Sequence, residues 1–215
     1  MSEVSPVVFV VDDDEHVRQA FARLLRTAGH LVETVGSAGE LLAHPALKRH
    51  PTCILLDLAL PDASGLDIQR ALGAIASIVF VSAHGDMGTA IEAMRAGALD
   101  FLEKPVDEQL LLSAVARGLE HGIKVFEQHT RSSEINLRMA RLTRREQEVM
   151  TLVADGLMNK QIANTLGIAE RTIKIYRGRM MQKMHVRSVP ELVRCLMQLD
   201  IDVSQAGDRQ DSLSR

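Results

Sequence analysis

A chain of 215 residues exceeds the usual size of one domain, so we expect two domains, each large enough to bury its own core. With 46% hydrophobic residues, 25% charged residues and a net charge of -3, the composition excludes a wholly disordered or fibrous chain. The apolar runs are of strand length, far below the roughly 18 residues that cross a bilayer, and the N-terminus has no secretory signal pattern, so we expect a cytoplasmic protein with no membrane partner.

The first 125 residues alternate apolar runs with helical periodicity. The runs that predict strands cover residues 7–11, 31–35, 53–56, 78–81 and 101–102. The amphipathic stretches that predict helices lie within residues 17–28, 41–42, 66–72, 90–94 and 110–115. A strand followed by a helix five times over predicts an α/β fold with a doubly wound, five-stranded parallel sheet. In such sheets ligands bind at the carboxyl ends of the strands, so candidate site residues should follow the apolar runs.

Beyond this region the chain changes character. Residues 119–139 are polar and contain no proline, which predicts that the last helix extends into a linker. Thr143 and Glu146 have the spacing of a capping box, and Gly156, Gly167 and Pro190 separate four short helical segments. We therefore expect an α/β domain over residues 1–120, a helical linker over 121–140, a separate all-α four-helix domain over 141–199 and a disordered tail over 200–215.

The two predicted domains differ in charge. Residues 1–125 hold 17 acidic and 10 basic residues, whereas residues 141–199 hold 5 acidic and 11 basic residues. A basic helical domain attached to an acidic one favours a nucleic-acid partner for the basic domain. A charged, solvated surface would give the same counts, so charge alone leaves the partner open.

Charged and polar side chains follow four of the predicted strands. Asp12 and Asp13 follow the first strand, Asp57 follows the third, Ser82 ends the fourth and Lys104 follows the fifth. Clustered carboxylates repel one another unless a cation lies among them, and a hard divalent ion such as Mg²⁺ prefers oxygen ligands. Such an ion can also hold a phosphoryl group and leave one carboxylate to act as a nucleophile. Taken singly, an acid at a strand end is more often a turn or helix-capping residue.

Four segments, residues 11–14 (VDDD), 56–65 (LDLALPDASG), 81–86 (VSAHGD) and 100–105 (DFLEKP), carry a resemblance to a known family. Over residues 6–120 the chain resembles the flavodoxin-like receiver domain of two-component response regulators, and most of all the FixJ-like group. The resemblance implies that Asp57 accepts a phosphoryl group from a sensor histidine kinase. It further implies that Mg²⁺ or Mn²⁺ binds Asp12, Asp13, Asp57 and the backbone carbonyl of Ala59.

The same resemblance implies a switch that links phosphorylation to dimerisation. Ser82 and Lys104 would hold the phosphoryl oxygens, Phe101 would be the aromatic switch residue, and the bond between Lys104 and Pro105 would be cis. Phosphorylated receivers of this group pair as homodimers. The residues at the matching dimer face are Ile91, Arg95 and Asp100.

A second resemblance covers residues 141–199, carried by residues 142–150 (LTRREQEVM), 156–163 (GLMNKQIA), 166–168 (LGI) and 171–174 (RTIK). This region is similar to the LuxR-type helix-turn-helix, which binds double-stranded promoter DNA. The resemblance implies that Lys174, Ile175 and Gly178 face the major groove. It makes Asn159, Lys160, Arg171 and Arg177 candidates for contacts with the DNA backbone. Gly178 and Tyr176 depart from the long polar residue and the His that are usual at their positions, which leaves the base-reading code undefined.

Two other functions would account for part of this pattern. Asp12 and Asp14 have the D-x-D spacing of haloacid-dehalogenase-like phosphatases, but His16 stands where that motif has Thr or Val, and a DNA-binding domain would be unexplained in such an enzyme. A regulator that works without phosphorylation is the other alternative, and the complete set of pocket residues argues against it. The sequence thus predicts a transcription regulator, activating transcription with RNA polymerase, whose only chemistry is phosphorylation and dephosphorylation of its own receiver.

Overall fold

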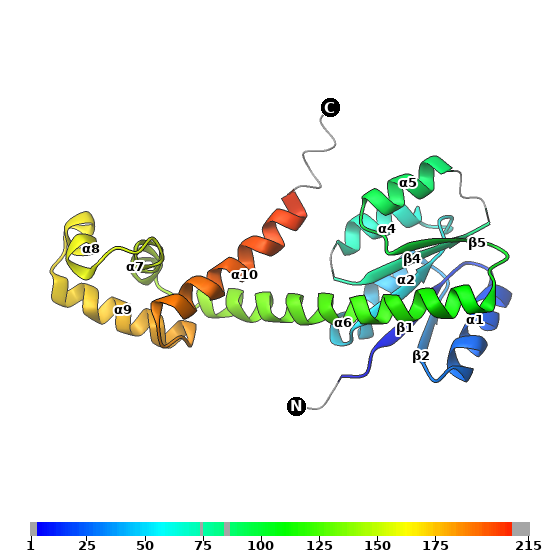
Figure 1. Ribbon diagram of the computed structural model, residues 1–215, viewed down its shortest axis with the longest axis horizontal. Helices are drawn as coiled ribbons and strands as arrows, with labels where there is room; N and C mark the ends of the chain where they lie inside the picture. The colour runs from blue at the N-terminus through cyan, green and yellow to red at the C-terminus, as the bar shows by residue number, and fades with distance from the viewer. Residues whose placement is uncertain (1–3, 74, 84–86, 208–215) are drawn as a thin grey trace. The chain divides into compact units, whose positions relative to one another are not determined.

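The computed structural model describes residues 4–73, 75–83 and 87–207, with side chains described as far as residue 199. The chain divides into two compact units, Met1–His129 and Thr130–Arg215. The helix α6 (Glu108–Met139) contains the division and so contributes residues to both units (Figure 1).

A five-stranded parallel sheet forms the centre of the first unit. Its strands are β1 (Val7–Val11), β2 (Leu31–Val35), β3 (Thr52–Leu56), β4 (Ser77–Ser82) and β5 (Asp100–Glu103), in the order β2-β1-β3-β4-β5. Every residue of β1, β3 and β4 is buried, which explains their continuous apolar sequences. The predicted sheet is confirmed. Its strand order reverses between β1 and β3, the place where such sheets bind ligands.

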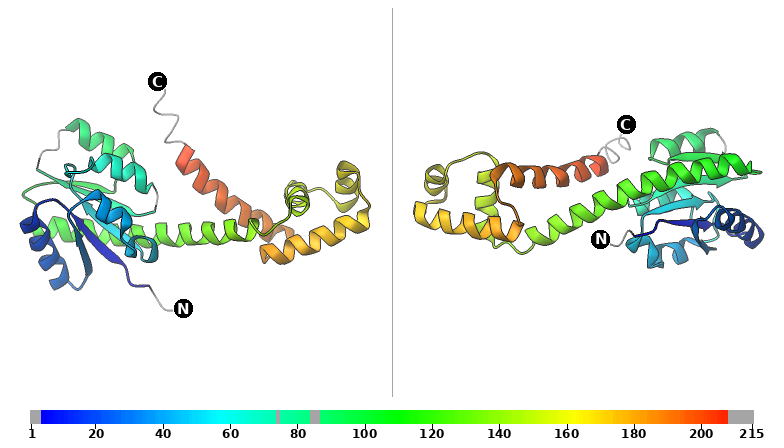
Figure 2. Two further views of the ribbon diagram at one scale, coloured as in Figure 1. Left: turned by 180° about the vertical axis from the view of Figure 1, so that it is seen from behind. Right: turned by 60° about the horizontal axis from the view of Figure 1, so that its bottom comes forward.

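Helices cover both faces of this sheet (Figure 2). They are α1 (Glu15–Thr27), α2 (Ala38–Ala43), α3 (Ala46–Arg49), α4 (Gly65–Leu72), α5 (Met87–Arg95) and the first part of α6. Alternate residues of β1 point to opposite faces, so Phe9 packs in the core beneath α2 to α5, whereas Val8 and Val10 pack in the core beneath α1 and α6. The one-turn helix α3 was not predicted, because four residues are too few to show helical periodicity.

The second unit is all-helical, as predicted. After α6 it contains α7 (Arg144–Ala154), α8 (Asn159–Leu166), α9 (Glu170–Met184) and α10 (Val189–Gly207). Thr143 and Glu146 form the predicted capping box at the start of α7. Gly167 has a φ of 66°, a left-handed conformation that favours glycine, and it turns the chain from α8 into α9. Ile162 and Ile173 are fully buried in the core between these two helices.

Two long helices cover the segments predicted as linker and tail. The helix α6 has 32 residues and runs through the segment predicted as a helical linker, where neither proline nor a turn sequence interrupts it. The helix α10 continues to Gly207, so it includes the first half of the segment predicted as a disordered tail. Residues 208–215, together with residue 74 and the motif residues 84–86, lie outside the described residues. Among the described helices, none combines the length and the apolar character that crossing a membrane requires.

Candidate functional site

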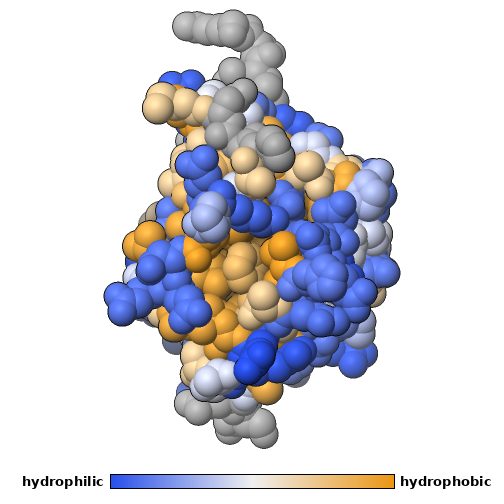
Figure 3. All heavy atoms as spheres, turned by 90° about the vertical axis from the view of Figure 1, so that its right-hand side faces the viewer, coloured by the Kyte–Doolittle hydropathy of each residue, from blue (hydrophilic) through white to orange (hydrophobic). Residues whose placement is uncertain are grey.

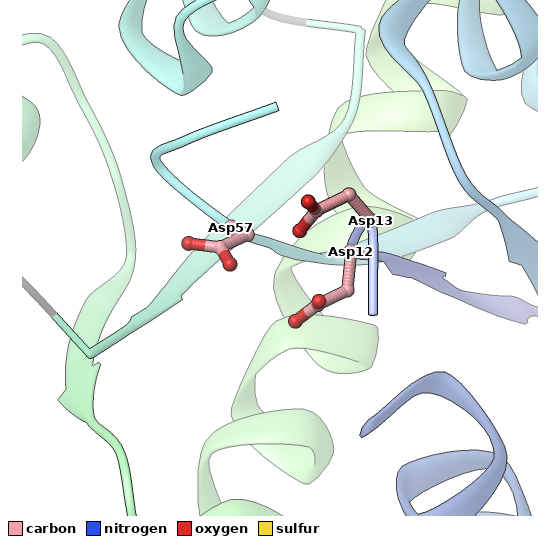
Figure 4. A group of neighbouring side chains, drawn as sticks. All are labelled: Asp12, Asp13 and Asp57. Atoms are coloured by element: carbon pink, nitrogen blue, oxygen red, sulfur yellow. The ribbon is translucent and has the colours of Figure 1, made fainter. Parts of the chain in front are cut away.

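Three carboxylates converge at the carboxyl edge of the sheet. Asp12 and Asp13 follow β1 and Asp57 follows β3, so neighbouring parallel strands deliver them to one place. One oxygen from each carboxylate lies within 4.8 Å of the other two. Figure 4 shows the three side chains pointing to the same side of the strand ends. The prediction that these acids gather at one edge is therefore matched by the geometry.

The ammonium group of Lys104 lies among these acids. Lys104 follows β5, and its Nζ donates to Asp12 Oδ2 at 2.5 Å and to Asp57 Oδ2 at 2.9 Å. Burial lowers the pKa of Lys104, but the hydrogen bonds from its ammonium to Asp12 and Asp57, together with their charges, raise it above its ordinary value. Lys104 is therefore a cation over the working pH range. Three carboxylates against one ammonium leave a net negative charge, which an oxygen-seeking divalent cation would neutralise.

Asp57 also faces a cavity of about 490 Å³. Polar lining is supplied by Asp13, Asp57, Ser64, Ser82 and Thr89, and apolar lining by Leu58, Ala59, Leu66 and Ala83. Ser82 is 3% exposed at the end of β4, and its carbonyl oxygen accepts a bond from Lys104 N at 2.9 Å. On the face of the molecule shown in Figure 3, apolar side chains gather in a central hollow and hydrophilic side chains surround it. Thr89, on α5, was not singled out in the sequence, because a lone Thr in a helix carries no chemical pattern.

Two aromatic rings and a glycine fix the surroundings of Asp57. The half-buried Phe101 of β5 lies beside Phe80 of β4, with ring centroids 6.1 Å apart. A Cβ on Gly65 would lie 2.7 Å from the carbonyl oxygen of Asp57 and 2.9 Å from the Phe80 ring, so only glycine fits at the start of α4. Lys104 and Pro105 are joined by a cis peptide bond.

The exposed side of α9 carries the residues predicted to meet DNA. Arg171, Lys174, Ile175 and Gly178 are exposed, whereas Ile173 faces the core. The Lys174 ammonium lies 3.3 Å from Glu170 Oε1, one turn earlier on the same helix. A Cβ at Gly178 would meet no atom within 4 Å, so packing within the chain does not require glycine there.

A contact between two predicted DNA-binding residues connects α8 to α9. The half-buried Arg177 donates from Nη1 to Asn159 Oδ1 at 2.9 Å. Lys160, next to Asn159 on α8, is exposed. The structure thus brings the basic residues of both helices into one module, with a polar contact holding one guanidinium in place.

Both units of the chain match known protein families. Residues 8–116 match the response regulator receiver domain, and residues 140–196 match the luxR family of bacterial regulatory proteins. The transcriptional regulatory protein FixJ of Azorhizobium caulinodans is 41% identical over 97% of this chain and 98% of its own length. The chain belongs to the FixJ-like response regulators.

Other relatives of this response regulator share its length. Nodulation protein W of Bradyrhizobium diazoefficiens is 41% identical over 95% of this chain and 91% of its own length. The solved structure of the response regulator StyR is 43% identical, with a TM-score of 0.69, and the match covers 90% of this chain and 99% of that one. The similarity to these relatives therefore extends over both the receiver and the luxR-family part of this chain.

The residues predicted for the receiver dimer face lie on two elements, α5 and β5. Ile91 is 46% exposed on α5, and Arg95 is exposed one turn further on. Asp100, at the start of β5, is engaged by the chain itself, because its Oδ2 accepts a hydrogen bond from Arg117 Nη2 of α6 and its Oδ1 accepts one from Phe101 N. No sequence pattern singles out Arg117, because its contact with Asp100 spans 17 residues and arises only when α6 packs back against the start of β5.

Proposed function

We propose that this response regulator accepts a phosphoryl group on Asp57 from a sensor histidine kinase, dimerises through its receiver and binds promoter DNA to activate transcription by RNA polymerase. The proposal rests chiefly on the position of Asp57. Its carboxylate faces the cavity, bonds to Lys104 and lies beside two further acids. Because its target is DNA, we place its activity in the cytoplasm.

Asp57 is the carboxylate best placed to act as the nucleophile. Asp12 is 3% exposed, and its two oxygens accept bonds from Lys104 Nζ and from Asp14 N. Asp13 lines the cavity, and Asp12 bonds to Lys104, but of these three acids Asp57 alone does both. In the proposed step an Asp57 oxygen bonds to phosphorus, the phosphorus–nitrogen bond of a phosphohistidine breaks, and the leaving imidazole nitrogen takes a proton.

The donor set fits a hard divalent cation. We expect Mg²⁺ or Mn²⁺ to be held by Asp12, Asp13, Asp57 and the backbone carbonyl of Ala59, which lines the same cavity. When bound, the ion would offset the negative charge of the phosphoryl oxygens. The ammonium of Lys104, which bonds to Asp12 and Asp57, supplies a further positive charge that can pair with the phosphoryl oxygens.

Phosphorylation of Asp57 would alter the dimer face by moving Ser82 and Phe101. The hydroxyl of Ser82 would donate to a phosphoryl oxygen, and the movement of Ser82 would open space beside β4 and β5. Phe101 is half-buried next to Phe80 and could turn inward into that space. A single covalent event would then shift the balance between two packings of the same face.

Dimerisation would use the surface of α5 and β5. Ile91 would supply apolar contact across a two-fold axis, and Arg95 would approach Asp100 of the other chain. Since Asp100 already pairs with Arg117 in the same chain, Arg95 would have to share or replace that pairing. Two receivers joined in this way would bring two helix-turn-helix modules to adjacent half-sites.

For DNA, we assign base-facing positions to Lys174, Ile175 and Gly178. Their exposure on α9, with the opposite side of the helix buried, supports this assignment. Contacts with phosphates are assigned to Asn159 and Lys160 at the start of α8, to Arg171 near the start of α9, and to the half-buried Arg177, which bonds to Asn159.

The proposal is tested by labelling the full chain with radioactive acetyl phosphate in the presence of Mg²⁺. Asp57→Asn keeps the shape of the side chain but removes the nucleophile, so we expect it to abolish labelling. Asp67→Asn, which changes an exposed acid on α4 in the same way, is the control and should label like the unchanged chain. Undiminished labelling of Asp57→Asn would refute the assignment. Continuous release of many phosphates from small phosphate esters would instead indicate a hydrolase.

A further inference from the structure

The turn between β2 and α2 contacts both loops that carry the proposed metal ligands. One loop follows β1 and holds Asp12 and Asp13, and the other follows β3 and holds Asp57 and Ala59. The contacts are made by Arg18 of α1 and by Asp62 of the second loop. Neither residue lies among the proposed metal ligands, so they would act on the site only through the loops.

Arg18 restrains the first loop through two hydrogen bonds. Its Nη1 donates to the carbonyl oxygen of Asp12 at 2.6 Å and to that of Asp13 at 2.9 Å. Hydrogen bonds from a charged guanidinium are shorter and stronger than neutral ones. Because one nitrogen holds two consecutive carbonyls, it fixes the peptide planes from which both carboxylates extend.

Asp62 restrains the second loop through two hydrogen bonds. Its Oδ1 accepts a hydrogen bond from Ala38 N at 3.0 Å, and its Oδ2 accepts one from Gly39 N at 2.9 Å. These backbone bonds, first that from Gly39, lower the pKa of Asp62 below its ordinary value. The loop itself is closed by an isolated bridge between Ala59 and Ser64, so holding Asp62 restrains the short segment that contains Ala59.

The turn is built to receive both contacts. A Cβ on Gly36 would lie 3.3 Å from Arg18 Nη1, so the missing side chain lets the guanidinium lie against the turn. The turn is fixed in its own right, since Gly36 N donates to Glu40 Oε2 at 2.8 Å and Ser37 Oγ accepts from Glu40 N at 3.3 Å. Arg18 thus lies against this turn, and Asp62 is hydrogen-bonded to the first two residues of α2 directly after it, so both loops are held against one short segment.

We propose that Arg18 and Asp62 are positioning residues, which hold the two halves of the metal site at their working separation by fastening them to the β2–α2 turn. This inference rests on the proposed function of the site. Loss of Arg18 would have two opposite effects on cation affinity, one through its charge and one through the position of the loop. Removing a nearby positive charge by itself strengthens cation binding, whereas releasing the loop weakens it. The sign of the effect therefore tells positioning from electrostatics.

The test is the affinity of the full chain for Mn²⁺, measured from the paramagnetic resonance signal of the free ion. We expect Arg18→Gln to raise the dissociation constant about tenfold, a usual effect of losing a contact behind the ligands. Arg23→Gln removes the same charge from an exposed position of α1 and should leave the affinity within about twofold, because exposed charges are largely screened.

Asp62 and Gly36 supply variants that separate geometry from charge. Asp62→Ala and Asp62→Asn remove the same charge, but the Asn oxygen can still accept one of the two hydrogen bonds, so Ala should weaken Mn²⁺ binding more. Gly36→Ala changes no charge and presses on Arg18 Nη1, so it should also weaken binding. Circular dichroism melting checks that each variant is folded. If Arg18→Gln fails to fold, the Mn²⁺ affinity of Gly36→Ala tests the inference instead.

An Arg18→Gln or Gly36→Ala chain that is folded and binds Mn²⁺ as tightly as the unchanged chain, or more tightly, would overturn the inference. Equal losses for Asp62→Ala and Asp62→Asn would show that Asp62 acts only through its charge. Asp13→Asn tests the underlying site separately. If Asp13→Asn does not weaken Mn²⁺ binding, the proposed metal site is wrong, whatever the other variants show.

Discussion

Replacing Lys104 with Met should destabilise the receiver in a way that divalent cations reverse. The Lys104 side chain is 17% exposed and bonds to Asp12, 4% exposed, and to Asp57, 11% exposed. At an effective dielectric constant of about 20, charges 2.9 Å apart attract by about 6 kcal/mol before desolvation is subtracted. Removing one partner of a buried pair costs about 3–5 kcal/mol, since it leaves uncompensated charge behind. We expect a loss of about 3 kcal/mol in the unfolding free energy of the receiver.

The assay is hydrogen exchange of β1 and β3 amides, which reports the opening of this unit separately from the helical one. Without Mg²⁺, Lys104→Met should exchange faster, and saturating Mg²⁺ should slow its exchange more than that of the unchanged chain, because the competing ammonium is gone. Lys124→Met removes a pair whose side chains are 70% and 73% exposed, so it should cost under about 1 kcal/mol. Equal stability of the two variants, or no extra response to Mg²⁺, would refute the electrostatic account.

Three further predictions concern the helical unit and the dimer. Burial raises the pKa of Glu146, but hydrogen bonds from Lys183 and Thr143 lower it below the ordinary value of 4.5. The stability of the helical unit should therefore fall as the pH drops below about 4.5. Glu146→Gln should lose this pH dependence in acid-unfolding curves followed by circular dichroism. Lys174→Ala should lower discrimination between cognate and scrambled DNA by about 1–3 kcal/mol in titrations, whereas Lys160→Ala should weaken both and reduce the salt dependence; equal losses on both DNAs would make Lys174 a phosphate contact. Arg95→Glu should leave Asp57 phosphorylation intact yet keep the phosphorylated chain monomeric in sedimentation, and adding Asp100→Lys should restore the dimer; a phosphorylated Arg95→Glu dimer would exclude this face.

Structural features that depend on a local pattern of residue types were predictable from the sequence. The bounds of β1 and β2 follow from apolar runs that match the strands residue for residue. The gathering of Asp12, Asp57 and Lys104 follows from the rule that parallel strands end at one edge, combined with the family resemblance.

Features that depend on long-range contact were not predictable. Asp62 bonds to Ala38, 24 residues away, and the sequence around Asp62 holds no signal for that partner. Arg18 bonds to the carbonyl oxygens of Asp12 and Asp13, and a single Arg in an amphipathic helix carries no signal for such a contact. Arg117 reaches Asp100 from a different element, across 17 residues. Such pairs are decided by how the elements pack, and a single sequence holds no periodic signal for them.

The central claim, that Asp57 carries the phosphoryl group, is tested most directly by locating the group in the unchanged chain. Borohydride reduces an aspartyl phosphate to homoserine, which peptide mass spectrometry can assign to a position. After treatment with acetyl phosphate and Mg²⁺, we predict homoserine at position 57 and unchanged aspartate at Asp12 and Asp13. Homoserine at either of those positions, or phosphate on a hydroxyl side chain with position 57 unchanged, would contradict the account.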